Sequence, residues 1–140
     1  MLEAAVKALP DVGLSVEAVS PMVQTAPLGP SRRRYANAAA VVATALGPDA
    51  LLDTLQAIEL GFGRTRRGAR WGARVLDLDI VLWDGGAWAS RRLVIPHPEF
   101  RRRGFVLAPS AAIASRWVDP LSNLSLFQLH ARLTRGKSLP

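Results

Sequence analysis

Two aspartates interrupt an apolar run at residues 75–83, and this segment constrains the fold more than any other stretch of the chain. Side chains alternate along a β-strand, so residues two apart share a face. One face would carry residues that suit a core, namely Leu76, Leu78, Ile80 and Leu82. Asp77 and Asp79 would lie together on the other face. The pattern therefore predicts a strand with one core face and one carboxylate face.

Two carboxylates on one face, roughly 7 Å apart along a strand, repel each other unless a cation lies between them. An all-oxygen ligand set suits Mg²⁺, which takes one or two carboxylates and completes its shell with water and phosphate oxygens. The alternative is the solvated face of a half-exposed sheet. Arginines precede the pair on a glycine-bearing loop, at Arg64, Arg66, Arg67, Arg70 and Arg74. These either neutralise the carboxylates or bind the oxygens of a polyphosphate.

Charge and composition narrow the class of protein. The net charge is +7 and the pI is about 11.4, and 16 of the 18 basic residues are arginine. A surface with this excess of arginine attracts nucleic acid or a nucleotide. A general compositional bias toward arginine is an alternative explanation for the excess. The chain lacks cysteine, which excludes disulfides and thiolate metal sites. It also lacks a membrane-length apolar run and a signal-peptide layout, so we expect a cytoplasmic protein without membrane contact.

The remaining pattern predicts one α+β domain over residues 1–140. Helices are predicted at 2–9, 47–63 and 124–133, and in part of 104–114. Strands are predicted at 14–25, 35–46, 75–83 and 93–97, with Pro21 marking an edge or a bulge. This order favours an antiparallel sheet with helices on one face.

Beyond these patterns, two quoted stretches resemble a known family. "RWGARVLDLDIVLWDG" (70–85) and "RRLVIPHPEFRRRGFVLAP" (91–109) resemble the signature region of 6-hydroxymethyl-7,8-dihydropterin pyrophosphokinases, enzymes of folate biosynthesis. Upstream, "VQTAPLGP", "YANAAAVVAT" and "LLDTLQAIELGFGRTR" agree as well. The resemblance runs from about residue 2 to about residue 135, and its R-W-G-x-R-x-L-D-L-D-I string is specific to that family.

The resemblance implies transfer of pyrophosphate from ATP to the hydroxymethyl oxygen of the pterin, releasing AMP. It also implies a ferredoxin-like fold and two Mg²⁺ ions held by Asp77 and Asp79. Arg64 and Arg74 match catalytic arginines that contact the triphosphate. The positions that match residues around the nucleotide are Gln56, Glu59, Arg66, Trp71, Ile80, Arg92, His97 and Arg103. The positions that match the pterin pocket are Thr25, Leu28, Tyr35, Asn37 and Phe105, where the ring would stack between Tyr35 and Phe105.

Some of these residues also have structural interpretations. Tyr35 and Phe105 suit a core, Trp71 suits loop packing, and His97 suits a buried position with backbone partners. His130, on the last predicted helix, is expected to have no special role. The expected partners are ATP and the dihydropterin, with no nucleic acid, and we expect a monomer.

The sequence departs from the family pattern at its start. Family members begin with a strand and a Gly-Ser-Asn loop before the first helix, whereas this sequence begins inside that helix, so we expect the first strand to be absent. A start codon assigned too late, a truncation with altered pairing, and a sheet completed by another copy each account for this, and we favour the first. Besides the enzyme, a nucleic-acid-binding module and an inactive folded relic remain as alternatives.

Overall fold

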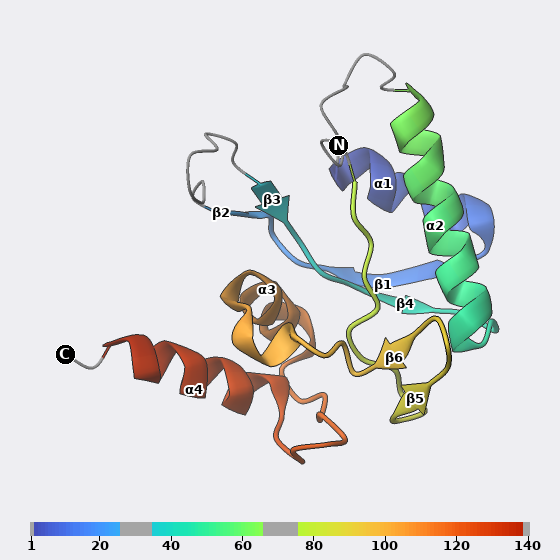
Figure 1. Cartoon of the computed structure of the whole chain (residues 1–140). Coiled ribbons are helices and arrows are strands. Elements are labelled where there is room, and N and C mark those ends of the chain that lie inside the picture. The colour runs from blue at the N-terminus through green and yellow to red at the C-terminus, as the bar shows by residue number, and fades with distance from the viewer. Residues whose placement is uncertain (1, 26–34, 66–75, 139–140) are drawn as a thin grey trace.

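The computed structural model describes residues 2–25, 35–65 and 76–138; for 25, 35, 64–65 and 136–138 the description covers the backbone. Figure 1 shows the elements, which in chain order are α1 (Leu2–Ala8), η1 (Pro10–Val12), β1 (Ser15–Val19), β2 (Val23–Thr25), β3 (Tyr35–Asn37), β4 (Ala40–Ala43), α2 (Pro48–Thr65), β5 (Trp88–Ala89), β6 (Val94–Ile95), η2 (Phe100–Arg102), α3 (Gly104–Ala114) and α4 (Leu126–Ser138). Helices combine with small antiparallel sheets, so the α+β class is confirmed.

The longest helix, α2, follows from its sequence. Pro48 occupies the first helical position and Asp49 places a carboxylate in the first turn, where the helix dipole favours it. Leu55 and Ile58 are buried on one face. The predicted helices at 2–9, 47–63 and 124–133 are confirmed within two residues at each end, except that the last one continues five residues further, to Ser138. The segment 104–114 is helical throughout. No described helix is long and apolar enough to cross a membrane.

The two strands predicted at 14–25 and 35–46 form a hairpin that is broken midway. β1 pairs antiparallel with β4, and β2 pairs antiparallel with β3. The break falls beside Pro21, which cannot donate to a ladder. There the Ser20 N–H donates to the Ala39 carbonyl at 2.8 Å and the Ala39 N–H donates to the Ser20 hydroxyl at 2.9 Å. A side chain therefore replaces one rung of the ladder at the bend.

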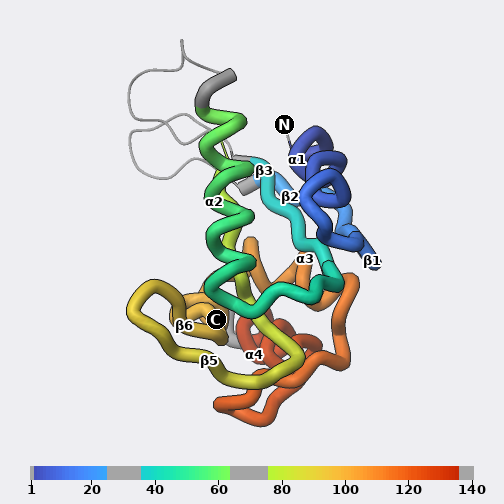
Figure 2. Tube along the Cα trace, turned by 90° about the vertical axis from the view of Figure 1, so that its right-hand side faces the viewer, coloured from blue at the N-terminus to red at the C-terminus, as the bar shows by residue number. Residues whose placement is uncertain are grey.

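The strand predicted at 75–83 is wrong for its described part. Residues 76–83 are assigned to no strand. Figures 1 and 2 show them as an extended segment that runs beside α2. Alternation correctly predicted which way the side chains of residues 76–80 face, because Leu76, Leu78 and Ile80 pack in a core. It does not hold for the neighbours Val81 and Leu82, which both pack against a second group of buried side chains. Alternation does not supply a pairing partner. Instead of a neighbouring strand, the Leu78 N–H has the Glu59 carboxylate, and the Val81 and Trp83 carbonyls accept the N–H groups of His97 and Gly86.

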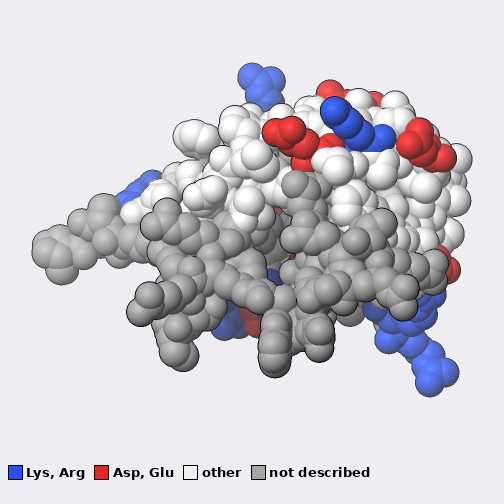
Figure 3. All heavy atoms as spheres, turned by 90° about the horizontal axis from the view of Figure 1, so that it is seen from above, with Lys and Arg blue, Asp and Glu red and all other residues white. Residues whose placement is uncertain are grey.

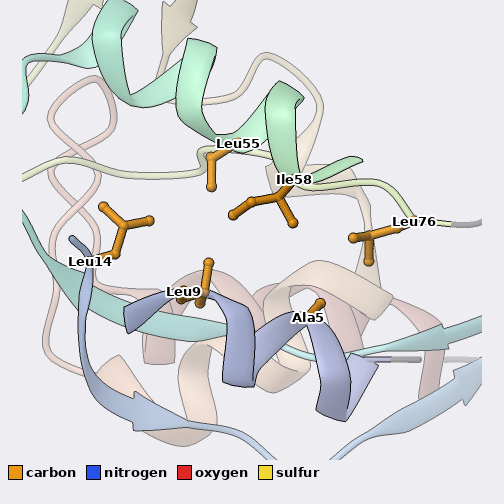
Figure 4. Close-up of a cluster of buried hydrophobic side chains, with 6 residues drawn as sticks. All are labelled: Ala5, Leu9, Leu14, Leu55, Ile58 and Leu76. Carbon is orange, nitrogen blue, oxygen red and sulfur yellow. The ribbon is translucent and has the colours of Figure 1, made fainter. Parts of the chain in front are cut away.

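Two apolar clusters form the core. The first lies between α1 and α2 and consists of Ala5, Leu9, Leu14, Leu55, Ile58 and Leu76. Figure 4 shows the α2 side chains pointing toward those of the first helix, with Leu14 and Leu76 to either side. The second cluster packs α3 against α4 and contains Phe100, Leu107, Ala114, Leu126 and Leu129. The segment 76–83 contributes to both clusters, and this fixes it between the two halves of the molecule.

Candidate functional site

The extended segment 76–83 presents the two aspartates to solvent. Asp77 and Asp79 are exposed, while Leu76, Leu78 and Ile80 turn into the first cluster. The segment is attached to α2 by a hydrogen bond in which the Leu78 N–H donates to the Glu59 carboxylate at 2.6 Å. An N–H to carboxylate bond is charge-assisted and therefore stronger than a neutral one. It fixes the backbone midway between the two aspartates.

His97 faces the same carboxylates. Its Nε2 lies 4.0 Å from the Asp79 carboxylate, and its Nδ1 accepts the Glu99 N–H at 3.1 Å. Because Nδ1 accepts, the proton of the neutral ring is on Nε2 and faces Asp79. The backbone N–H of His97 donates to the Val81 carbonyl at 3.0 Å, which ties this residue to the aspartate-bearing segment.

A cavity of about 340 Å³ opens beside these groups. Its walls come from Leu52 of α2, from residues 78–80, from residues 90–94 around the β5–β6 turn, and from residues 97–98. Aliphatic side chains thus meet one carboxylate, one imidazole and two arginines. A cavity with this lining suits a flat apolar group that carries an anionic tail.

Arg92 forms one charged wall of the cavity and is held from α2. Its guanidinium forms an ion pair with Asp53 and donates to Gln56 at 3.4 Å. The hydrogen bond and the charge of Asp53 raise the pKa of Arg92 above its ordinary value, and the charge of Asp49 raises it further. The structure therefore brings together two predicted nucleotide residues, Gln56 and Arg92.

A second group of predicted residues lies where α3 meets the β2–β3 hairpin. Asn37 is half-buried in β3, and Phe105 is 38% exposed at the start of α3. The guanidinium of Arg103 stands 5.8 Å from the centre of the Phe105 ring, within the range of a cation–π contact. Phe105 is thus a partly exposed aromatic rather than a core residue, as binding of a flat ring requires.

Several predicted site residues lie outside the described part of the chain. Leu28, Arg66, Trp71 and Arg74 are among the residues that the structure does not describe, and so are the side chains of Thr25, Tyr35 and Arg64. Of the remaining ones, Glu59, Ile80, Arg92 and His97 gather around the cavity or its attached segment, with Asp77, Asp79 and Gln56.

The donor set fits a hard divalent cation that brings further oxygen ligands with it. Among the described residues, no three His, Cys, Asp or Glu side chains form a metal-binding group. Asp77 and Asp79 alone would leave most of the coordination shell to water and phosphate, which is the way Mg²⁺ binds with nucleotides. The carboxylate pair therefore suits Mg²⁺ and excludes a closed structural zinc site within this part of the chain.

Two residues near the cavity were missed by the sequence interpretation. Asp49 accepts hydrogen bonds from Trp88 and Ser90, and Asp53 pairs with Arg92. Their spacing with Gln56, four and then three residues, places all three on one helix face. This row of polar residues could have indicated a contact between that face of α2 and another segment. The solvent-exposed face of any amphipathic helix has the same pattern, however.

Charge on the described surface is mixed. Figure 3 shows acidic and basic side chains beside one another along the upper edge of that view, and a group of basic side chains at lower right. An interface for the phosphate backbone of nucleic acid needs a continuous basic strip. The described part of this face does not present one.

Known proteins are similar to this chain over most of its length. Residues 1–115 match the family described as 7,8-dihydro-6-hydroxymethylpterin-pyrophosphokinase (HPPK). The 2-amino-4-hydroxy-6-hydroxymethyldihydropteridine pyrophosphokinase of Synechocystis sp. is 42% identical over 117 residues, which are 84% of this chain and 60% of the relative. The enzyme of that name from Pseudomonas aeruginosa is 48% identical over 98 residues, covering 69% of this chain and 60% of the relative. The one from Haemophilus influenzae is 42% identical over 125 residues, covering 88% of this chain and 78% of the relative.

The chain thus spans about three-fifths of the length of the first two relatives. The family match covers most of the chain, and sequence identities of 42–48% are well above those of proteins that share only a fold. The chain belongs to the 7,8-dihydro-6-hydroxymethylpterin-pyrophosphokinase family.

Proposed function

We propose that this chain transfers pyrophosphate from ATP to 6-hydroxymethyl-7,8-dihydropterin. The hydroxymethyl oxygen would attack the β-phosphorus and form a new P–O bond. The bond from the β-phosphorus to the oxygen that bridges it to the α-phosphorus would break, AMP would leave with that oxygen, and the hydroxyl proton would pass to solvent. Family membership and the names of the relatives support the reaction.

The observation that carries the proposal is the cavity at which the aspartate segment, α2 and the β5–β6 turn meet. The adenine and ribose would occupy its aliphatic part, between Leu52 and Ile80. Arg92 and His97 would face the phosphates, with Gln56 and Glu59 supporting them from α2. In this arrangement the protein binds and orients the triphosphate.

Asp77 and Asp79 would hold Mg²⁺ together with the phosphate oxygens. When bound, Mg²⁺ supplies positive charge that offsets the charge developing on the transferred group. We propose two ions, because two adjacent carboxylates with a triphosphate offer enough oxygens for both. The arginines at 64, 66 and 74 would add donors to the phosphates, with Trp71 beside the nucleotide.

The pterin would lie at the junction of α3 and the β2–β3 hairpin. Phe105 would cover one face of the ring and Tyr35 the other, and Asn37 would supply both a donor and an acceptor to its polar edge. Thr25 and Leu28 would close the pocket, and Arg103 would extend from the Phe105 ring toward the phosphates. We propose that this arrangement sits on a ferredoxin-like sheet that lacks one interior strand within residues 1–140.

The test is AMP formation by the chain with ATP, 6-hydroxymethyl-7,8-dihydropterin and Mg²⁺. AMP is expected only when all three are present. Asp79→Ala should reduce kcat by at least about 100-fold, the size of effect seen when a transition-state charge loses its partner. Asp84→Ala is the matched control, because it removes an exposed acid from the turn that follows the same segment and should leave the rate unchanged.

Two results would contradict the proposal: AMP release that does not need the pterin, and full activity of Asp79→Ala. Binding of DNA or RNA that persists without Mg²⁺ and weakens steeply with salt would favour the nucleic-acid module instead. A chain that folds cooperatively but forms no AMP would favour the inactive relic.

A further inference from the structure

One polar face of α2 lies against the turn between β5 and β6. Asp49, Asp53 and Gln56 share this face, and all three have hydrogen bonds to the turn or its flanks. Figures 1 and 2 both show the β5–β6 hairpin beside the first turns of α2. The nucleotide cavity has Leu52 on one side and residues 90–94 on another, so this contact sets the distance between two of its walls.

Ser90 is the centre of the turn. Its N–H donates to the Leu93 carbonyl at 2.9 Å, and its hydroxyl oxygen accepts the N–H groups of Arg92 at 3.3 Å and Leu93 at 3.2 Å. A hydroxyl has one proton and two lone pairs. If both lone pairs accept, as they do here, the proton must point elsewhere.

The Ser90 hydroxyl proton forms a hydrogen bond to Asp49. The Ser90 hydroxyl donates to the Asp49 carboxylate at 2.8 Å, whereas its other acceptor, the Leu93 carbonyl, is 3.4 Å away. The shorter bond to a charged acceptor is the stronger one. The carboxylate therefore fixes the rotation of the hydroxyl and leaves its lone pairs for the two N–H groups of the turn.

The same carboxylate oxygen also holds the strand before the turn. The Trp88 indole N–H donates to it at 3.3 Å, and the Trp88 ring packs edge-on against Trp83, with centroids 5.8 Å apart. Asp49 thus ties both the beginning of the hairpin and its turn to α2. It is not among the described residues that line the cavity.

We infer that Asp49 is a positioning residue for nucleotide binding: it fixes the Ser90 turn and thereby holds Arg92 at the wall of the cavity. The inference rests on the proposed function, because it takes the cavity to be the ATP site. Asp53 bonds to the Arg92 side chain itself, whereas Asp49 bonds to the Ser90 side chain at the turn whose backbone carries Arg92. A nucleotide would then meet an arginine whose backbone is already ordered, and would not have to order it on binding.

The test compares Asp49→Ala with Asp49→Asn. Alanine removes the acceptor, whereas the asparagine amide oxygen can still accept from both Trp88 and Ser90. Asp49→Ala should raise the Kd and KM for ATP about tenfold, the lower end expected when a hydrogen bond to a charged group is lost. The kcat and the KM for the pterin should stay within about twofold of the original, and Asp49→Asn should restore ATP binding to within about threefold.

Ser90→Ala tests the same link without changing α2, in case Asp49→Ala does not fold. Ser90→Ala should weaken ATP binding as well. The double variant Asp49→Ala/Ser90→Ala should bind ATP no more weakly than the weaker of the two single variants, because both substitutions remove the same Ser90–Asp49 hydrogen bond. Asp11→Ala is the charge-matched control, since it removes an exposed acid from η1, and it should leave all constants unchanged.

Unchanged ATP binding in Asp49→Ala, equal weakening in the alanine and asparagine variants, or full additivity with Ser90→Ala would each overturn the inference. Amide hydrogen exchange separates its failure from a failure of the proposed function. In the ligand-free protein, the amides of Arg92 and Leu93 should exchange faster in Asp49→Ala and at the original rate in Asp49→Asn. That result supports the positioning of the turn even if the chain forms no AMP, and unchanged exchange in Asp49→Ala contradicts it.

Discussion

Replacing Asp119 should destabilise the fold more than any change at the surface. Asp119 is fully buried, yet it keeps its charge because four hydrogen bonds reach it. Arg101 donates twice, at 2.6 and 2.8 Å, the Ser122 hydroxyl donates at 2.7 Å, and the Leu121 N–H donates at 3.1 Å. These bonds join η2 to the loop before α4, so their loss would loosen the second core cluster at its edge.

The magnitude follows from the pair that is broken. Removing one partner of a buried ion pair costs about 3–5 kcal/mol, since the other charge stays behind without compensation. The Arg101 side chain is 28% exposed and can regain some water, so Asp119→Ala should cost about 3 kcal/mol. For a domain of this size, that lowers Tm by roughly 10 °C.

The pH dependence gives a second, independent magnitude. Burial raises the pKa of Asp119, but the bonds from Arg101, Ser122 and Leu121 and the charge of Arg101 outweigh it, and the pKa falls from 3.8 to about 2. A lowered folded-state pKa contributes stability that is complete above the unfolded pKa and is lost as the pH falls through the folded one. The contribution, about 2 kcal/mol, should therefore be constant down to about pH 4 and decline from there toward pH 2.

The assay is chemical denaturation of the original chain, of Asp119→Ala and of Asp119→Asn from pH 7 to pH 3. The difference in unfolding free energy should narrow below about pH 4. Glu99→Ala is the control, because it removes an exposed ion pair between the residue before η2 and Arg102 within it, and it should cost less than about 1 kcal/mol. A difference below about 0.5 kcal/mol at pH 7, or one that does not change with pH, would refute the reasoning.

Two further predictions concern backbone geometry and the aspartate segment. A Cβ on Gly85 would lie 2.4 Å from the Trp83 ring, so Gly85→Ala should lower the free energy of unfolding by about 1–3 kcal/mol, as measured by denaturation. Gly61 lies in open space on α2, so Gly61→Ala should raise the free energy of unfolding by about 0.5–1 kcal/mol. Glu59→Ala should lower the rate of AMP formation about tenfold and speed amide exchange at Leu78, because that N–H loses its acceptor; Glu59→Gln should restore both, and equal rates in the two variants would contradict this.

Local patterns predicted the helices well because their signals are contained within each segment. The stripe and the early proline of α2 define that helix without reference to the rest of the chain. The facing of Asp77 and Asp79 was predicted for the same reason, since alternation along an extended backbone depends on that backbone alone. The exposed carboxylates and the buried Leu76 confirm it.

Features that depend on distant partners could not be read in this way. Whether residues 76–83 join a ladder depends on which backbone lies beside them, and here a glutamate 19 residues earlier in the chain takes that place. Asp119 gives no signal at all, because a lone aspartate before a proline looks like an ordinary loop residue. Its partner Arg101 lies among three consecutive arginines, and nothing in that run distinguishes the one that pairs with Asp119.

β1 and β4, the pair on one side of the break beside Pro21, contain a β-bulge, and this bulge restricts how the chain can change in length. Val16 pairs with Val42 and Ala18 pairs with Val41, so Glu17 is an extra residue on one strand. The neighbouring valines of β4 pack in different clusters, Val42 in the first and Val41 in the second. Deleting or inserting one residue in β4 would exchange them and empty a site in both cores. We therefore expect related sequences to vary in length at the loops on either side of β4, and to keep its four residues without gaps.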